Sequence, residues 1–131
     1  MKNLQILIRE KNPIIASILQ IQIQDVGYTA VDGPTSLSDF IKAREQIQPE
    51  LSIIGIDLAD LPDRQSISIL FEELALHPTL FLIAYPRMTS ELSRYISSPH
   101  DILYKPFSHQ DFLQKLQNIP IIRTYMKRTN A

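Results

Sequence analysis

Polar and charged residues follow several short apolar segments of the chain, and their types and spacing could support chemistry. The residues at the ends of these apolar segments are Arg9-Glu10-Lys11, Gly55-Ile56-Asp57, Ala84-Tyr85 and Tyr104-Lys105-Pro106-Phe107. Carboxylates and an ammonium group gathered at one edge of a sheet could bind a phosphoryl group or a hard cation that prefers oxygen ligands. They are therefore the first candidates for a functional site.

Other kinds of catalytic or metal site lack the residues they need. The chain has no cysteine, which excludes disulfides, iron–sulfur clusters and thiol chemistry. His77, His100 and His109 show no metal-ligand spacing, and no nucleophile elbow is present. Only three glycines occur, without a glycine-rich phosphate loop. The sequence thus predicts no enzymatic activity, no cofactor and no bound metal.

Composition sets limits on the class of protein and on its partners. A chain of 131 residues with 44% hydrophobic and 21% charged residues is typical of one globular domain. Its formal net charge is -1, whereas nucleic-acid binders carry a basic surplus. No run of 18 apolar residues and no signal peptide occur, so we expect a cytoplasmic protein without nucleic-acid or membrane contacts.

Strand-like and helix-like segments alternate along the chain. Apolar, β-branched runs predict strands, and amphipathic stretches between them predict helices. The predicted strands are residues 4–8, 28–31, 51–56, 80–84 and 101–104, and the predicted helices are 13–25, 38–46, 65–77, 89–97 and 108–120. Five strands alternating with five helices indicate a doubly wound α/β domain, a five-stranded parallel sheet with helices on both faces.

Capping residues support several of these boundaries. Asn12 followed by proline is typical of a helix start, and Gly27 is typical of a helix end. Ser108 with Asp111 three residues later predicts a capping box. The second helix is expected to bury Phe40, Ile41 and Ala43, and the third to carry Ile67, Ile69, Leu70, Leu74 and Leu76. In open parallel sheets, ligands bind beyond the carboxyl ends of the strands, where the candidate residues lie.

At this point the chain resembles the response-regulator receiver domain family, whose sheet is flavodoxin-like or CheY-like with strand order 2-1-3-4-5. The most specific motif is Tyr104-Lys105-Pro106-Phe107, which is similar to the Lys-Pro-Phe motif after the family's last strand. Residues 7–13 resemble the first strand and acidic turn, and residues 49–54 resemble the approach to the phosphoacceptor. The resemblance implies a receiver-like domain over residues 1–119 and a tail or helix extension over 120–131.

The resemblance also implies where a phosphorylation pocket should lie, and the residues there do not fit it. The acidic pair that holds Mg²⁺ in the family falls on Glu10 and Lys11, and an ammonium at Lys11 would repel the metal. The phosphoacceptor falls on Gly55, which has no nucleophile, and the hydroxyl switch position falls on Ile83. Lys105 retains the family type, as does Glu10.

The later aromatic switch position of the family falls on Ile102. The resemblance therefore implies a degenerate pseudo-receiver, a signalling domain that is not phosphorylated and acts through protein–protein interaction.

Two alternatives remain open. Asp57 could serve as a displaced phosphoacceptor of an atypical two-component phospho-receiver, although its loop proline comes one residue late. A nucleotide- or flavin-binding domain is disfavoured by the missing glycine loops. Lys105-Pro106 either contacts a phosphoryl group or shapes the turn before the last helix, and we favour the structural role.

Two surfaces are candidates for a protein partner, either a signalling protein such as a histidine kinase-like component or a second copy of the chain. By resemblance, one comprises the fourth helix, the fifth strand and the fifth helix, with Glu91, Arg94, Tyr95 and Tyr104 as contact residues. The other is the first helix, whose apolar arc is wider than a one-sided helix needs. That arc comprises Ile14, Ile15, Ile18, Leu19, Ile21, Ile23 and Val26. If this arc is a self-association surface, replacing Ile23 with Lys should change the molecular mass in solution.

Overall fold

The computed structural model describes residues 4–57, 71–84 and 100–129. Its strands are β1 (Gln5–Arg9), β2 (Thr29–Asp32), β3 (Leu51–Ile56), β4 (Thr79–Ile83) and β5 (Asp101–Tyr104). All five pair in parallel in the order β2-β1-β3-β4-β5. The predicted parallel sheet and its strand order are confirmed.

The described helices are α1 (Pro13–Asp25), α2 (Leu37–Ile47), α5 (His109–Asn118) and α6 (Pro120–Thr129). The Asn12 side chain accepts hydrogen bonds from the N–H groups of Ile14 and Ile15, so it caps α1 as predicted. Ser108 and Asp111 form the predicted capping box at the start of α5. Gly27, just beyond α1, has a φ of 92°, a conformation that favours glycine.

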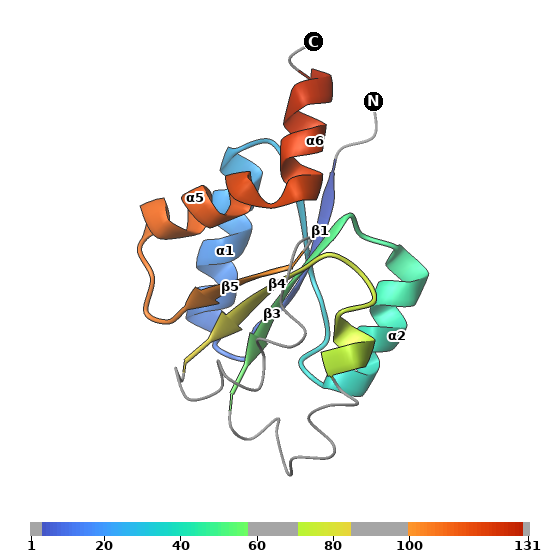
Figure 1. The fold of residues 1–131 in the computed structure, drawn as a ribbon. Coiled ribbons are helices and arrows are strands. Elements are labelled where there is room, and N and C mark those ends of the chain that lie inside the picture. Colours follow the sequence, from blue (N-terminus) through green and yellow to red (C-terminus); the bar gives the residue numbers. More distant parts are fainter. Residues whose placement is uncertain (1–3, 58–70, 85–99, 130–131) are drawn as a thin grey trace.

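Helices cover both faces of the sheet (Figure 1), with α1 and α5 on one side and α2 on the other. The core is accordingly divided into two clusters of buried side chains. One cluster, on the α1 side, includes Ile8, Leu19, Ile53, Leu82 and Phe112. The other, on the α2 side, includes Leu7, Phe40, Ile54, Phe81 and Ile83. Successive residues of a strand therefore alternate between the two clusters, as the pleat requires.

The last segment, residues 120–129, forms the separate helix α6. Its Ile122 is fully buried in the α1-side cluster. The rings of Tyr28 and Tyr125 meet edge to face with centroids 5.6 Å apart. Residues 120–129 are therefore helical, and this helix packs against the core.

Several predicted features differ from the structure or lie outside its described residues. Ile23 is fully buried, so it is a core residue and cannot probe a surface. Leu76 is 65% exposed, because the helical turn before it ends at Leu74. The predicted helix 89–97 and residues 65–70 of the predicted helix 65–77 lie outside the described residues.

No helix within residues 4–57, 71–84 and 100–129 is both long and apolar enough to cross a membrane.

Candidate functional site

The carboxyl ends of β1, β3 and β4 bring the predicted site residues together. Arg9 at the end of β1 is in register with Ile54 of β3, so Glu10 comes next to Gly55. The Lys105 backbone N–H donates to the carbonyl of Ile83 over 2.9 Å, which holds the start of the β5–α5 turn against β4. The Lys105–Pro106 peptide bond in this turn is cis.

Glu10 and Lys105 form an ion pair across this edge of the sheet. The ammonium of Lys105 donates to Oε1 of Glu10. The Glu10 side chain is only 3% exposed and that of Lys105 20% exposed. A buried carboxylate is unfavourable without a partner, and the positive charge of Lys105 stabilises Glu10 in this buried position.

The Glu10 carboxylate lies directly over Gly55. A Cβ added to Gly55 would overlap with Oε2 of Glu10, and would lie 3.0 Å from its carboxyl carbon. It would also lie 3.3 Å from the carbonyl oxygen of Arg9. The space that a side chain at position 55 would need is therefore occupied by Glu10. Sequence reasoning identified both residues but not this replacement of one by the other.

Lys11 and Asp57 form a second, more exposed pair. Their ammonium and carboxylate are 3.8 Å apart, and their side chains are 43% and 44% exposed. Asp57 is the first residue after β3, two residues beyond Gly55. Of the acidic pair expected by resemblance, Glu10 thus points inward to Lys105, while Lys11 contacts Asp57.

The structure corrects the predicted hydroxyl position on β4. Ile83 packs in the α2-side cluster and is fully buried, so it faces away from Gly55 and Glu10. Ala84, the next residue, shares a pocket with Lys105 and Ile15 on the α1 side. Alternation along the strand therefore places Ala84 at the position that faces the site. Alanine has no hydroxyl either, so the functional conclusion drawn for Ile83 holds for Ala84.

The predicted partner surface around β5 is described only in part. Tyr104 is 40% exposed, while Ile102 packs against the α2-side cluster. Glu91, Arg94 and Tyr95 lie outside the described residues.

Arg9 is a candidate residue from the sequence, but its burial is not predicted there. It is 1% exposed, and its guanidinium donates to the carbonyls of Gly55 over 2.6 Å and Thr35 over 2.7 Å. It therefore ties the end of β3 to the loop before α2. An arginine following an apolar strand suggests a solvated residue, so the pattern alone gives no sign of this burial.

The donor set does not fit the Mg²⁺ site that a receiver fold implies. A hard cation needs several oxygen ligands, but Glu10 is held by Lys105 and Lys11 lies beside Asp57. Within the described ranges, no group of three histidine, aspartate or glutamate side chains is arranged to hold a metal.

No family model matches the chain. Among curated proteins, it is 20% identical over 128 residues to the transcriptional regulatory protein TrcR of Mycobacterium tuberculosis. The match covers 95% of this chain but 48% of the relative, so the chain spans about half the length of that protein.

Solved structures share the fold more clearly than they share the sequence. A CheY-like response regulator receiver domain protein from Methanospirillum hungatei has a TM-score of 0.72 at 15% identity, covering 96% of this chain and 99% of that one. The PhyR response regulator REC domain of Erythrobacter litoralis has a TM-score of 0.70 at 21% identity, covering 91% of each chain. The chemotaxis protein CheY4 of Vibrio cholerae has a TM-score of 0.67 at 16% identity, covering 90% and 99%. The resemblance indicated by the sequence is thus confirmed for the fold, and the chain has the architecture of a CheY-like response-regulator receiver domain.

Proposed function

We propose that this chain is a pseudo-receiver, a signalling domain that is not switched by phosphorylation of an aspartate and that acts through protein–protein interaction, without catalysis. The observation that carries the proposal is the Glu10 carboxylate, which lies over Gly55 and is paired with Lys105. A carboxylate at this place fills the space of the missing acceptor and engages the lysine that would otherwise contact a phosphoryl group.

The other residues at this edge support the same function. Gly55 has no nucleophile, and Ala84 offers no hydroxyl. The Lys11 ammonium beside Asp57 opposes the binding of a dication at the rim. Phosphoryl transfer at this site would therefore require both the Glu10–Lys105 pair and the Lys11–Asp57 pair to be broken.

The proposal is tested by incubating the protein with acetyl phosphate and Mg²⁺ and measuring its intact mass. We expect no gain of a phosphoryl group, in the wild type or in the Asp57→Asn variant. Asp39, an exposed carboxylate on α2, gives a matched control substitution, Asp39→Asn. A stable gain of one phosphoryl group that is lost in Asp57→Asn but kept in Asp39→Asn would overturn the proposal and establish Asp57 as the acceptor.

The surface proposed for protein contact is the exposed face of α1. Ile14, Ile18 and Ile21 are 70%, 44% and 58% exposed, whereas Leu19 and Ile23 are fully buried. Asp25 is the single charged residue of α1. An exposed apolar surface with little charge is typical of a protein interface. We propose a signalling protein or a second copy of the chain as the partner.

Ile21→Lys is the variant that tests this surface, and Leu76→Lys, at a 65% exposed position away from α1, is its matched control. The readouts are the molecular mass in solution and binding to candidate signalling proteins, including histidine kinase-like components. We expect association to be lost in Ile21→Lys and kept in Leu76→Lys. Association unaffected by Ile21→Lys, or equally weakened by both substitutions, would exclude the α1 face.

A further inference from the structure

The exposed side of α1 carries a narrow stripe that consists of Ile14, Ile18, Ile21 and Asp25. The three isoleucines are 70%, 44% and 58% exposed, and Asp25 at the end of the helix is exposed as well. Their spacing of four, three and four residues places them along one line of an α-helix, on the side away from the sheet. This spacing is typical of a helix that packs lengthwise against a second helix.

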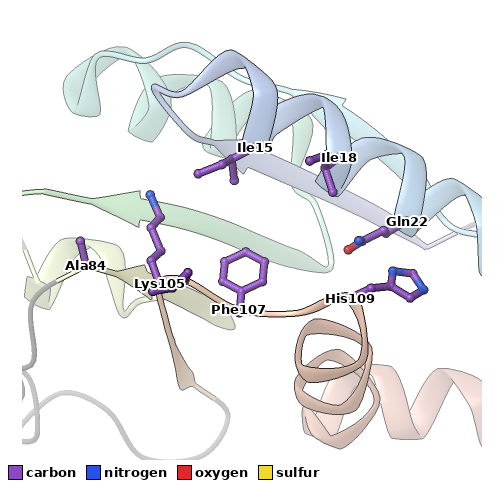
Figure 2. A pocket seen from close by; sticks show the side chains of 8 residues that line it. Ile15, Ile18, Gln22, Ala84, Lys105, Phe107 and His109 are labelled. Carbon is purple, nitrogen blue, oxygen red and sulfur yellow. The ribbon is translucent and has the colours of Figure 1, made fainter.

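The α1 stripe is distinct from the apolar hollow beside it. Figure 2 shows Ile15 and Gln22 pointing from α1 toward the turn that carries Phe107. Of the four stripe residues, Ile18 alone lines that hollow. A partner can therefore contact the stripe without entering the hollow.

The charges on and beside α1 favour a second copy of the chain as that partner. Asp25 is the single charged residue of the helix, so the apolar part of the stripe has no charge that would repel an identical surface. Lys11, which is exposed, lies just before the helix, so a cation precedes one end of the stripe and an anion lies at the other. Lys11 contacts Asp57 at 3.8 Å, but exposed pairs of this kind contribute little and can be exchanged.

An isologous dimer needs a surface that is complementary to itself under a twofold rotation. Ile18 is seven residues from both Lys11 and Asp25, so two antiparallel α1 helices that meet at Ile18 bring each Lys11 opposite Asp25 of the second copy. The same arrangement places Ile14 against Ile21 of the second copy. A parallel pair would instead bring like charges together at both ends, which is unfavourable.

We propose that the chain forms an antiparallel dimer through the α1 stripe, with a Lys11–Asp25 contact at each end. The inference rests on the α1 contact surface of the proposed function and names a second copy as its partner. A helix of 13 residues is about 20 Å long, so the contact is smaller than the roughly 800 Å² per partner of a standard interface. We therefore expect reversible association with a dissociation constant on the order of 100 µM.

Exchanging the two charges tests this arrangement. Lys11→Glu and Asp25→Lys each replace two attractive contacts with repulsive ones, so each should weaken the dimer about tenfold. The double variant restores both contacts with their signs reversed and should associate as the wild type does. Lys42→Glu and Glu45→Lys, at exposed positions of α2 on the other face of the sheet, are matched controls and should leave association unchanged.

Sedimentation equilibrium of the full chain, at concentrations that bracket the expected dissociation constant, measures each association. EDTA is present so that a carboxylate added at position 11 cannot recruit a cation, and backbone amide spectra show that each variant is folded. The proposal is overturned if the wild type remains monomeric, if the single charge variants associate as the wild type does, or if the double variant is as weak as the single ones. Equal weakening by the α2 controls would also overturn it.

Ile21→Lys separates a failure of this inference from a failure of the proposed function. If the wild type is monomeric but binds a signalling protein, and Ile21→Lys abolishes that binding, the dimer is overturned and the α1 contact surface stands. If Ile21→Lys changes neither self-association nor binding to a signalling protein, the α1 contact surface itself is overturned.

Discussion

The two ends of the sheet each hold a buried charged side chain, but with different partners. At the carboxyl ends of the strands, the carboxylate of Glu10 is paired with the side chain of Lys105. At the amino ends, the guanidinium of Arg44 donates to backbone carbonyls. Arg44 is 2% exposed and donates to Leu74 and Glu73 over 2.7 Å each. Burial lowers the pKa of Arg44, while the charges of Glu73 and Glu45 act in the opposite direction.

The difference lies in what each contact requires of the sequence. A backbone carbonyl is present whatever the residue, so the amino-end contact needs only Arg44. The carboxyl-end contact needs a glutamate, a lysine and a glycine small enough to leave room for the carboxylate. The carboxyl-end contact therefore depends on three residue choices that have to agree with one another.

Lys105→Met should have the largest effect on stability. It leaves the buried Glu10 carboxylate without its partner, which we expect to lower the free energy of unfolding by about 3 kcal/mol. Urea denaturation of the purified protein measures this loss.

The matched control for that substitution is Lys115→Met, which removes the exposed pair with Asp101, 41% and 39% exposed. Exposed pairs contribute little, so we expect a loss below about 1 kcal/mol. Equal losses in the two variants would contradict the distinction between a buried and an exposed pair.

Arg44→Met should lower the free energy of unfolding by about 2 kcal/mol, because the two hydrogen bonds from its guanidinium to the carbonyls of Leu74 and Glu73 are lost. Unlike Lys105→Met, it should leave the backbone amide signals of Glu10 and Gly55 unchanged, since its contacts lie at the other end of the sheet. Large shifts of those two signals in Arg44→Met would show that the two ends are coupled.

Gly55→Ala should lower the free energy of unfolding by about 2 kcal/mol, because the added methyl group would force Glu10 away from its present position. In a Glu10→Ala background the same substitution should cost much less, since the overlapping carboxylate is gone. A double-mutant cycle of urea midpoints measures this coupling.

Gly27→Ala is the control for the glycine substitution. Its φ of 92° makes alanine unfavourable by about 1 kcal/mol, but no atom lies within 4 Å of the added methyl group. Its cost should therefore be the same with and without Glu10→Ala. A Gly55→Ala cost that is equally insensitive to Glu10→Ala would show that Glu10 does not fill that space.

The smallest expected effect is a pH dependence at the amino ends of β4 and β5. Burial lowers the pKa of His100 below its ordinary value, with the charge of Arg44 acting in the same direction and a hydrogen bond to the Ala75 backbone opposing both. Its Nδ1 accepts from the Thr79 N–H over 3.2 Å, which only the neutral ring can do.

The unfolded chain therefore binds this proton first as the pH falls. The stabilisation is fully present above about pH 6.5 and is lost as the pH falls through the lower pKa of the folded state. We expect the urea midpoint to decrease from pH ~7.5 to ~5.5 and part of that decrease to disappear in His100→Gln. His109→Gln, at an exposed histidine, is the control, and an equal effect of both substitutions would contradict this role of His100.

Much of the fold was predictable from sequence, because periodicity and caps act locally. Asn12 and Ser108 predicted the starts of α1 and α5, and the alternating apolar runs predicted the parallel sheet. The site was predictable as a set of losses at Lys11 and Gly55. These follow from residue type alone, without knowledge of geometry.

The remaining features depend on where side chains point, which the residue types did not reveal. The sequence resemblance places Ile83 in the pocket, but the pleat of β4 turns it to the α2 side and leaves Ala84 at the site. Arg9 is buried because carbonyls of two different segments converge on it. Ile23 belongs to the core because the buried face of α1 is set by its packing against the sheet.

A Mg²⁺ titration followed by backbone amide shifts tests the central claim most directly. If the Glu10–Lys105 pair prevents metal binding at the site, Mg²⁺ should cause no saturable change in the wild-type amide signals of Glu10, Gly55, Asp57 and Lys105. Saturable shifts at these residues that disappear in Asp57→Asn would show instead that the site accepts a metal ion, and would contradict the account of a closed pocket.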